Sequence, residues 1–436
     1  MLRLAYNLVF PFVLVLAAPY YLWRIWRRGS VTRAFGERLA IYSPSARARL
    51  AALDRPVWLH AVSVGEMMLA TVLARELRRR RPQLDLVITT TTATGRRVGE
   101  RLADDHLVLL YNPADLWYTV SAAFRRIRPR LLILLEQELW PNYIWQAADR
   151  QVPVWLLHAR LSARSFARFK KFRRLLRPVL SKLALTVAQD EEDLARLADA
   201  GFPAHALFCA GSMKFDVAEL AAADGDLAGP LRAQLGWQPA DRVLLAGSTF
   251  SGEERIFLQL FAALKRAFPD LRLVLAPRHV ERADEIAALC RGFTVSVVRQ
   301  SQLPPDGAPL TVTPDVLLAD LTGVLRALYA LGTVNFVGKS LRGRGGQNFI
   351  EAARAGKPVV VGPHTQNFAR LTELFVREQA LIQVRDAAEL RVAVSGLLAD
   401  AADRERWGAA ARRVYAENLG AGEKSAAMIL QFLDNL

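Results

Sequence analysis

The stretch VWLHAVSVGEMMLATVLARELRRRR, residues 57–81, contains the unit from which the whole fold is predicted. It opens with an apolar run, which is typical of a strand buried on both faces of a sheet. After a short polar turn, apolar residues recur at helical spacing, and the stretch ends in consecutive arginines, as the last turn of a helix often does. A strand that leads into a helix predicts one repeat of a parallel sheet covered by helices.

The same alternation continues along the chain in two series of apolar runs, separated by a polar, Ala- and Gly-rich stretch at residues 221–230. We therefore predict an α/β fold with two doubly wound, Rossmann-like domains, residues 29–220 and 221–436, whose carboxyl strand ends face a ligand-binding cleft. The first series is VWLHAV (from Val57), LDLVITTTT (from Leu84), LVLLYNP (from Leu107), LLILLE (from Leu131), PVWLLHA (from Pro153) and LTVAQ (from Leu185). The second is RVLLAGS (from Arg242), LRLVLAP (from Leu271), VLLAD (from Val316), TVNFVG (from Thr333) and PVVVGP (from Pro358).

Length and composition limit the classes of protein. A chain of 436 residues is too long for one ordinary core, and a hydrophobic content of 52% excludes a largely disordered protein. The net charge of +16 attracts phosphates, anionic lipid headgroups or nucleic acid, and does not choose among them. The two cysteines, Cys209 and Cys290, have no metal ligands near them in sequence, so we expect a reducing compartment and no structural zinc.

The N-terminus begins with an apolar run. Residues 4–23 carry no charge and are followed at once by Arg24, Arg27 and Arg28. This length is just enough to span a bilayer, and the aromatic residues near its end suit a lipid–water interface. We predict that residues 1–28 attach the protein to a membrane, across it or in its surface, with a buried core helix as the alternative. The arginines place the rest of the chain in the cytoplasm.

Glu66 lies where the first strand of the series passes into a helix. Its charge could simply complement the helix dipole. It could equally be a general base that faces the cleft.

Glu136 and Glu138 lie just past a buried strand and form a second candidate site. On an extended backbone both carboxylates would project to one side. They could share acid and base duties or hold sugar hydroxyls, and the alternative is a cap on the helix that starts near Pro141.

The second half of the chain carries polar motifs at several strand ends. The residues from Ala246 to Thr249 have small side chains and free amides that could bind a phosphate. The alternative is that this stretch only caps the following helix, through Ser251. Arg278 and His279 end another strand, where a fixed cation could neutralise a leaving phosphate. Further along, Gly345 and Gly346 allow close backbone approach before a helix, with Asn348 near its start and Glu351 one turn on.

The segment from residue 160 to residue 182 carries nine Lys or Arg residues and no acid. Interleaved aromatic and Leu residues give it an apolar side. A basic amphipathic helix on an anionic membrane is one interpretation, and a solvated basic helix face is the other.

These motifs together resemble the 3-deoxy-D-manno-octulosonic acid (Kdo) transferases of lipopolysaccharide assembly, which are glycosyltransferases with the GT-B fold. Nearly the whole chain takes part in the resemblance. The matching stretches, in order, are the apolar N-terminus, FGERLA from Phe35, HAVSVGE from His60, TTTTATG from Thr89, EQELWPN from Glu136, HARLSARS from His158, GSMKFD from Gly211, GSTFSGEE from Gly247, APRH from Ala276, FVGKSL from Phe336, GGQN from Gly345 and GPHTQNF from Gly362.

The resemblance implies an inverting transferase on the cytoplasmic face of the inner membrane, with CMP-Kdo, a lipid A precursor and the anionic membrane surface as its partners. It implies that Glu66 is the catalytic base, that the N-terminal domain binds the acceptor and that the C-terminal domain binds the CMP-sugar. The acceptor-binding residues would be Ser63, Gly65, Glu136, Glu138 and Arg160. The donor-binding residues would be Lys214, Ser248, Thr249, Arg278, His279, Ser340, Gly345, Gly346, Asn348 and Glu351.

No metal or separate cofactor is expected. Asp104 and Asp105 form only an isolated acidic pair. Helix N-termini and an arginine can stabilise the charge of a departing CMP without a metal.

Four donor-side positions depart from the family pattern. Val324 replaces the acid of DTxGE, Lys339 replaces a glycine of FVGGS, Gln347 replaces the histidine of GGHN, and Ala352 replaces the proline of EPA. One alternative is therefore a GT-B transferase that uses another activated sugar. An alternative of another class is a basic nucleic-acid-binding protein, which we disfavour because no stacking-rich RNA motif or helix-turn-helix pattern occurs. A catalytically inactive scaffold is disfavoured because Glu66 is retained.

Overall fold

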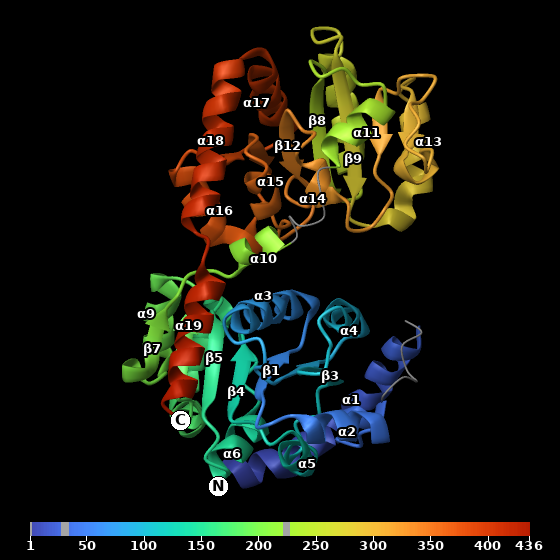
Figure 1. The fold of residues 1–436 in the computed structure, drawn as a ribbon. Coiled ribbons are helices and arrows are strands. Elements are labelled where there is room, and N and C mark those ends of the chain that lie inside the picture. Colours follow the sequence, from blue (N-terminus) through green and yellow to red (C-terminus); the bar gives the residue numbers. More distant parts are fainter. Residues whose placement is uncertain (1, 28–34, 221–226) are drawn as a thin grey trace. The chain divides into compact units, whose positions relative to one another are not determined.

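The computed structural model describes residues 2–27, 35–220 and 227–436. Two compact units make up the chain. The first comprises Met1–Val217 together with Leu419–Leu436, and the second comprises Ala218–Asn418. Figure 1 shows a sheet flanked by helices in each unit.

The first unit contains a seven-stranded sheet in the order β3-β2-β1-β4-β5-β6-β7, with every paired strand parallel. The strands are β1 (Val57–Ala61), β2 (Leu86–Thr90), β3 (Leu107–Tyr111), β4 (Leu131–Leu135), β5 (Val154–Ala159), β6 (Leu185–Ala188) and β7 (Leu207–Cys209). The helices are α1 (Leu2–Arg27), α2 (Pro44–Ala52), α3 (Val64–Arg80), α4 (Ala93–Glu100), α5 (Trp117–Ile127), α6 (Pro141–Asp149), α7 (Ala163–Lys171), α8 (Arg173–Leu180), α9 (Glu191–Ala200) and α19 (Ala421–Asp434).

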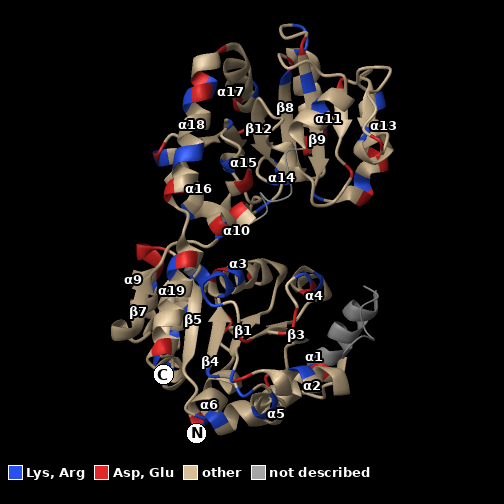
Figure 2. Cartoon of the chain, in the orientation of Figure 1, with Lys and Arg blue, Asp and Glu red and all other residues tan. Residues whose placement is uncertain are grey.

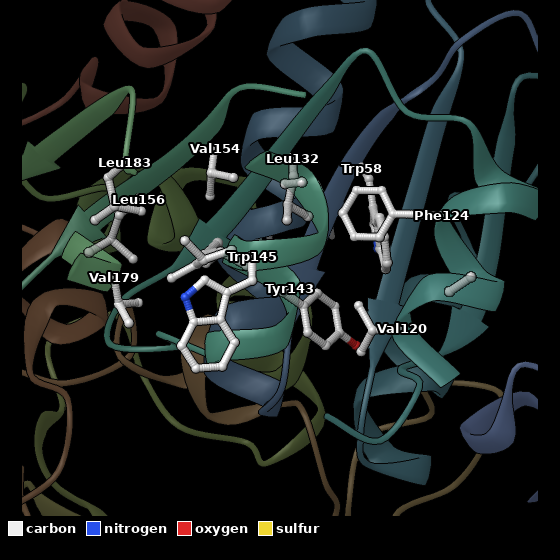
Figure 3. Packing of buried hydrophobic residues seen from close by; sticks show 14 of the residues in the cluster. Trp58, Val120, Phe124, Leu132, Tyr143, Trp145, Val154, Leu156, Val179 and Leu183 are labelled. Carbon is white, nitrogen blue, oxygen red and sulfur yellow. The ribbon is translucent and has the colours of Figure 1, made fainter. Parts of the chain in front are cut away.

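The strands of this sheet are continuous apolar runs because both of their faces are buried. In β1, Trp58 joins the core on one face, where it packs against Phe124 and Tyr143 (Figure 3). Val57 and Leu59 point to the opposite core, under α3. Full burial of such a side chain stabilises the fold by about 1.5–3 kcal/mol, so the strands hold the loops at their carboxyl ends firmly in place.

The second unit contains another seven-stranded sheet of parallel pairs, in the order β10-β11-β9-β8-β12-β13-β14. The strands are β8 (Arg242–Thr249), β9 (Leu271–Pro277), β10 (Val297–Arg299), β11 (Val316–Leu318), β12 (Val334–Val337), β13 (Val359–Val361) and β14 (Ile382–Gln383). The helices are α11 (Ala228–Gln234), α12 (Glu253–Leu264), α13 (Ala283–Arg291), α14 (Leu325–Leu328), α15 (Ile350–Arg354), α16 (Ala369–Arg377), α17 (Ala387–Ala399) and α18 (Ala401–Glu417), and α10 (Lys214–Leu220) bridges the unit boundary. In both units charged residues lie mostly on the helices and at the strand ends (Figure 2).

Every apolar run predicted to be a strand is one, so the α/β prediction is confirmed. The sequence missed β7, β10 and β14, which are two or three residues long and lie at sheet edges. Edge strands this short bury little apolar surface, so they leave no run in the sequence.

The last helix differs from the predicted domain limits, because residues 419–436 belong to the first unit and not to the second. Helix α19 lies along α3 (Figure 1). A Cβ on Gly422 would lie 2.4 Å from Cγ1 of Val72, so glycine permits this close approach. The carboxylate of Asp216 accepts hydrogen bonds from the amides of Gly420 (2.7 Å) and Gly422 (3.1 Å), which fixes the start of α19.

Helix α1 is attached to the first unit along one side. The Tyr6 hydroxyl donates to the buried carboxylate of Asp115 at 2.7 Å, and Arg3 pairs with Asp149. The other side is apolar and exposed, so the alternative of a buried core helix is wrong; its exposed residues are Leu4, Leu8, Val9, Phe12, Val13, Val15 and Leu16. Among the described residues, no helix has the length and apolar character to cross a membrane. Arg28, and the side chains of Arg24, Arg27 and the interfacial aromatic residues, lie outside the described part of the chain.

The basic segment forms two short helices, α7 and α8, where the sequence predicted one. Phe172 interrupts the helix. Most of the apolar side packs on the core, through Phe166, Phe169 and Leu176, because it covers the adjoining sheet. Phe172 and Leu175 alone among the segment's described large apolar residues are exposed.

Candidate active site

Three carboxylates lie at the carboxyl edge of the first sheet. Glu66 follows β1 at the start of α3, and Glu136 and Glu138 follow β4. The two strands are paired neighbours, so their ends lie side by side. This edge is where doubly wound sheets bind ligands.

Glu66 is held rigidly. Ser63 is the N-cap of α3: its hydroxyl oxygen accepts from the Glu66 amide (3.2 Å), and its hydroxyl donates to Oε1 of Glu66 (2.8 Å). The Val62 amide donates to Oε2 at 2.7 Å. These bonds resemble a capping box, and they place the Glu66 carboxylate in the first turn of α3, as the helix-dipole interpretation requires. The carboxylate is nevertheless fixed at a strand end, and each oxygen keeps a lone pair for a further partner.

The environment of Glu66 favours a proton acceptor. Burial raises the pKa of its carboxyl above the ordinary value, and the charge of Glu136 raises it further, while the bonds from Val62 and Ser63 partly offset the rise. A carboxylate with a raised pKa is a stronger base when ionised.

The pKa of Glu138 is also raised. Burial and then the charge of Glu66 raise its pKa to about 7, against the lowering effect of a hydrogen bond from the Trp140 indole, whose Nε1 lies 2.7 Å from Oε2. The interpretation of this residue as a helix cap is wrong, because α6 begins without a side-chain cap.

Glu136 is the opposite case. Its burial would raise the pKa, but a hydrogen bond from His158 and the charges of Arg160 and Lys214 lower it to about 2. Nη2 of Arg160 lies 3.4 Å from Oε2 of Glu136. Glu136 has φ of 55°, so the prediction that an extended backbone directs both glutamates to one side is wrong. Glu136 is therefore ionised at neutral pH, whereas the Glu138 carboxyl gains or loses its proton near pH 7.

The partners of Glu136 form a compact polar cluster at the end of β5. His158 is buried, with φ of 57°, and its Nε2 lies 3.2 Å from the Ser212 hydroxyl. Burial lowers the pKa of His158 to about 4 and also lowers the pKa of Lys214. Nε of Arg160 is buried without a hydrogen-bond partner among the described residues. Lys214, predicted to bind the donor, thus lies beside Glu136 and Arg160 in the first unit.

Sequence reasoning assigned no role to His158 or Trp140. They stand in EQELWPN and HARLSARS, but their contacts with Glu138 and Glu136 depend on backbone turns that neither motif predicts. The remaining acceptor-side residue, Gly65, is exposed in the first turn of α3, where a Cβ would meet only Ser63 Oγ, at 3.8 Å.

The carboxyl edge of the second sheet carries cations. Arg278 and His279 are exposed where β9 ends, and the Arg278 amide donates to the Thr249 carbonyl at 3.0 Å. The ring of Phe250 contacts two basic side chains: the centroid of the His279 ring lies 5.4 Å from its centroid in an edge-on arrangement, and Nζ of Lys339 lies 5.1 Å from its centroid.

The hydroxyls of Thr249 and Ser340 are already bonded within the protein. Thr249 donates to Oε1 of Glu254 at 2.9 Å, and Ser340 donates to the Val337 carbonyl and accepts from the Gly362 amide at 2.9 Å. Both residues are buried, so they hold the loops in shape. Ser248 is different, since it has φ of 54° and lies at the strand end.

A buried carboxylate that the sequence analysis left without a role organises this edge. Glu253 accepts hydrogen bonds from four backbone amides, those of Phe250 (2.9 Å), Lys339 (2.8 Å), Leu341 (3.1 Å) and Arg342 (3.1 Å). It therefore ties the turn after β8 to the loop after β12. The expectation that Ser251 caps α12 is wrong, because Gly252 is the N-cap.

The glycine turn is fixed by its neighbours. A Cβ on Gly345 would lie 2.5 Å from Nδ2 of Asn367, and one on Gly346 would lie 2.9 Å from the His364 carbonyl oxygen, so neither position accepts a side chain. Asn348 accepts from the Ile350 amide at 3.1 Å and so starts α15.

Glu351 pairs with Arg326, whose Nε lies 3.1 Å from Oε1. Arg326 was not predicted, because it comes from the separate helix α14. Among the described residues, no group of three or more His, Cys, Asp or Glu side chains is arranged to hold a metal ion.

Comparison with known proteins gives the site a context. Residues 33–217 match the family model described as 3-Deoxy-D-manno-octulosonic-acid transferase (kdotransferase). A protein named 3-deoxy-D-manno-octulosonic acid transferase from Haemophilus influenzae is 33% identical over 410 residues, which cover 91% of this chain and 94% of that protein. One of the same name from Bordetella pertussis is 36% identical over 425 residues, 94% of this chain and 95% of that protein.

Solved structures share the fold at lower identity. A UDP-GlcNAc 2-epimerase from Neisseria meningitidis has a TM-score of 0.62 at 13% identity and covers 87% of this chain and 100% of that one. A putative UDP-N-acetylglucosamine 2-epimerase from Listeria monocytogenes has a TM-score of 0.63 at 14% identity, covering 88% and 98%. These neighbours confirm the GT-B-like arrangement of two Rossmann-like domains.

Proposed function

Because the chain belongs to the family of 3-deoxy-D-manno-octulosonic acid transferases, we propose that this glycosyltransferase moves Kdo from CMP-Kdo to a hydroxyl of a lipid A precursor, with inversion at the anomeric carbon. The observation that carries the proposal is the buried Glu66 carboxylate, fixed by Ser63 and Val62 at a strand end, with a raised pKa. A fixed base of this kind is what acceptor activation requires.

The reaction step is a displacement at the anomeric carbon. Glu66 takes the proton of the acceptor hydroxyl as the acceptor oxygen bonds to the anomeric carbon of Kdo. The bond from that carbon to the phosphate oxygen of CMP breaks, and its electron pair leaves with CMP. The attack comes from the face opposite the leaving group, so the configuration inverts.

The neighbours of Glu66 fit an acceptor site. Glu136 stays ionised and Glu138 changes protonation near neutrality, so they can hold hydroxyls as acceptor and as donor respectively. The buried, unused Nε of Arg160 offers a donor beside them. We assign acceptor binding to these three residues together with Ser63 and Gly65.

The donor half supplies positive charge. Arg278 and His279 are exposed at the end of β9, and Ser248, Gly345, Gly346, Asn348 and Glu351 surround the neighbouring strand ends. Guanidinium groups and amides directed at a phosphate stabilise the charge that develops on leaving CMP. We assign these residues to donor binding, with Thr249 and Ser340 shaping the loops and Lys214 reaching the sugar. The proposal uses no metal and no nucleic acid.

A membrane-bound acceptor fits the surface of the first unit. The exposed apolar side of α1, held against the unit by Tyr6 and Arg3, suits insertion into the interface of a bilayer. The basic residues of α7 and α8 suit anionic headgroups and lipid A phosphates. We therefore propose attachment to the cytoplasmic face of the inner membrane by α1 lying in the membrane surface.

A second candidate is transfer of a different activated sugar, which the departures at Val324, Lys339 and Gln347 favour. Incubation of the purified protein with CMP-Kdo and a tetra-acylated lipid A precursor separates the two. We expect a product heavier by one or more Kdo units. Absence of transfer from CMP-Kdo, together with turnover of another sugar nucleotide, would contradict the first proposal.

A further inference from the structure

Lys339 occupies a backbone position that disfavours a side chain. It follows β12 with φ of 58°, in the left-handed region, which costs free energy for every residue except glycine. Non-glycine residues persist in such positions where the surroundings fix them, and they concentrate at ligand-binding sites. Lysine is not among the residues that adopt this conformation readily, so a compensating use of its side chain is expected.

The surroundings fix the Lys339 backbone at the carboxyl edge of the sheet. Its amide donates to Oε2 of Glu253 at 2.8 Å. The preceding residue, Gly338, donates to the Gly247 carbonyl at 2.7 Å, and a Cβ there would lie 2.5 Å from the Ser248 carbonyl oxygen. The lysine side chain therefore leaves the sheet next to the end of β8.

The ammonium group has no acidic partner. Nζ lies 5.1 Å from the centroid of Phe250, and no carboxylate among the described residues forms an ion pair with it. The carboxylate that accepts from the Lys339 amide, that of Glu253, is occupied by four backbone amides. A half-buried cation on an aromatic ring, without a counter-ion, is available to an anionic ligand.

We propose that Lys339 binds the phosphate of the cytidine monophosphate moiety of the donor together with Arg278, because the two residues follow β12 and β9, the strands that flank β8. This inference rests on the proposed function, because it needs a nucleotide at the carboxyl edge of the second sheet. Lys339 and Arg278 then form a pair of cations that neutralises the phosphate as the sugar departs. The left-handed backbone is retained because it directs the ammonium toward this edge.

The test measures CMP affinity by isothermal titration calorimetry on the full chain. Lys339→Met keeps the backbone conformation and most of the packing on Phe250 but removes the charge. We expect about tenfold weaker CMP binding, as for loss of one charge-assisted hydrogen bond. Lys339→Arg should restore affinity to near the wild-type value. The matched control is Lys357→Met, because Lys357 is exposed at the opposite edge of the sheet, just before β13, and should not affect CMP binding.

Lys339→Gly tests whether weaker CMP binding could result from a less stable fold. Glycine relieves the left-handed strain that methionine retains, so Lys339→Gly should unfold at a higher temperature than Lys339→Met. It should bind CMP as weakly as Lys339→Met does. A protein that is more stable yet binds less CMP separates the role in binding from a role in folding.

The outcomes of the inference and of the proposed function are distinguishable. If wild-type protein binds no CMP, the proposed function fails. If wild-type protein binds CMP and Lys339→Met binds it equally well, the inference about Lys339 is overturned while the proposed function stands.

Discussion

The carboxyl edges of the two sheets differ in charge although the sheets share their architecture. The first edge carries three carboxylates, those of Glu66, Glu136 and Glu138, although Arg160 and Lys214 lie beside Glu136. At the second edge the side chains singled out are basic, those of Arg278, His279 and Lys339. Both sheets have seven strands in parallel pairs, although the strand order differs on one side, where β11 lies between β10 and β9. The chemistry of each edge therefore comes from the few residues after each strand and not from the sheet itself.

The contrast suggests a division of labour. A carboxylate edge suits proton abstraction and the binding of hydroxyl groups, while a cationic edge suits a phosphate that gains charge. Each edge is also strained: Glu136 and His158 in the first unit, and Ser248 and Lys339 in the second, have positive φ. Six other non-glycine residues in the described part of the chain also have positive φ, so this conformation is not confined to the two edges.

The largest effect is expected from Glu66→Gln. The amide can still accept the bond from Val62, but it cannot take a proton, so transfer should fall by about 10²–10⁴-fold. Product mass spectrometry measures the loss. CMP affinity should stay unchanged, because the nucleotide belongs to the other edge.

Glu76→Gln is the control for this variant, since Glu76 lies on the same helix and pairs with Arg79 at the surface. Normal turnover in Glu66→Gln would remove Glu66 from the role of base.

Arg278→Ala tests the opposite edge. Loss of a cation on the phosphate should weaken CMP binding by roughly ten- to hundredfold and slow transfer in parallel. Calorimetry with CMP measures the first effect. Arg266→Ala, at an exposed arginine just after α12, should change neither quantity. Equal CMP affinity in wild-type and Arg278→Ala protein would show that this edge does not hold the phosphate.

Glu138→Gln tests the first edge through the pH dependence of folding stability. The folded pKa of about 7 lies above the ordinary value, so the folded state of the wild type loses stability as pH rises toward and through 7. Glutamine removes this loss. The variant should therefore be more stable than the wild type by about 1–3 kcal/mol at pH 8.5 and similar to it at pH 4.

The same substitution removes a negative charge near Glu66. The pKa of Glu66 should fall, and the rising limb of the pH–rate profile should move to lower pH. Chemical denaturation at the two pH values and a pH–rate profile provide the measurements. A stability difference that does not vary with pH would show that Glu138 is not the group that titrates near 7.

The smallest effect is expected from Arg326→Ala. This arginine pairs with Glu351 in a partly exposed position, and such a pair contributes about 0–1 kcal/mol. Its removal leaves a carboxylate unpaired near the phosphate, so CMP binding should weaken by about two- to fivefold. Arg326→Lys should recover part of the loss. Tighter CMP binding in Arg326→Ala would indicate that Glu351 lies away from the phosphate.

The central strands and the place of Glu66 could be predicted from the sequence. Strands buried on both faces leave uninterrupted apolar runs, and Ser63 three residues before Glu66 marks a capping box. The edge strand β14 could not be predicted, because two residues leave no pattern.

The details of the site depend on contacts between distant segments. The position of α19 is set by its packing against Val72 and Asp216, which stand more than 200 residues earlier in the chain. Glu136 has a left-handed backbone, so an extended strand end was the wrong expectation. The bond from Trp140 to Glu138 is local, since the two residues are two positions apart. The sequence therefore singled out the three glutamates as candidates, but it did not predict how their neighbours shift their pKa values.

A crystal structure of the chain with CMP bound tests most directly whether the first edge serves the acceptor and the second edge binds the phosphate. The account predicts the phosphate against Arg278 and Lys339, at the ends of β9 and β12, with Glu66 free of nucleotide. Density for CMP against Glu66 and Glu138, at the ends of β1 and β4, would contradict it.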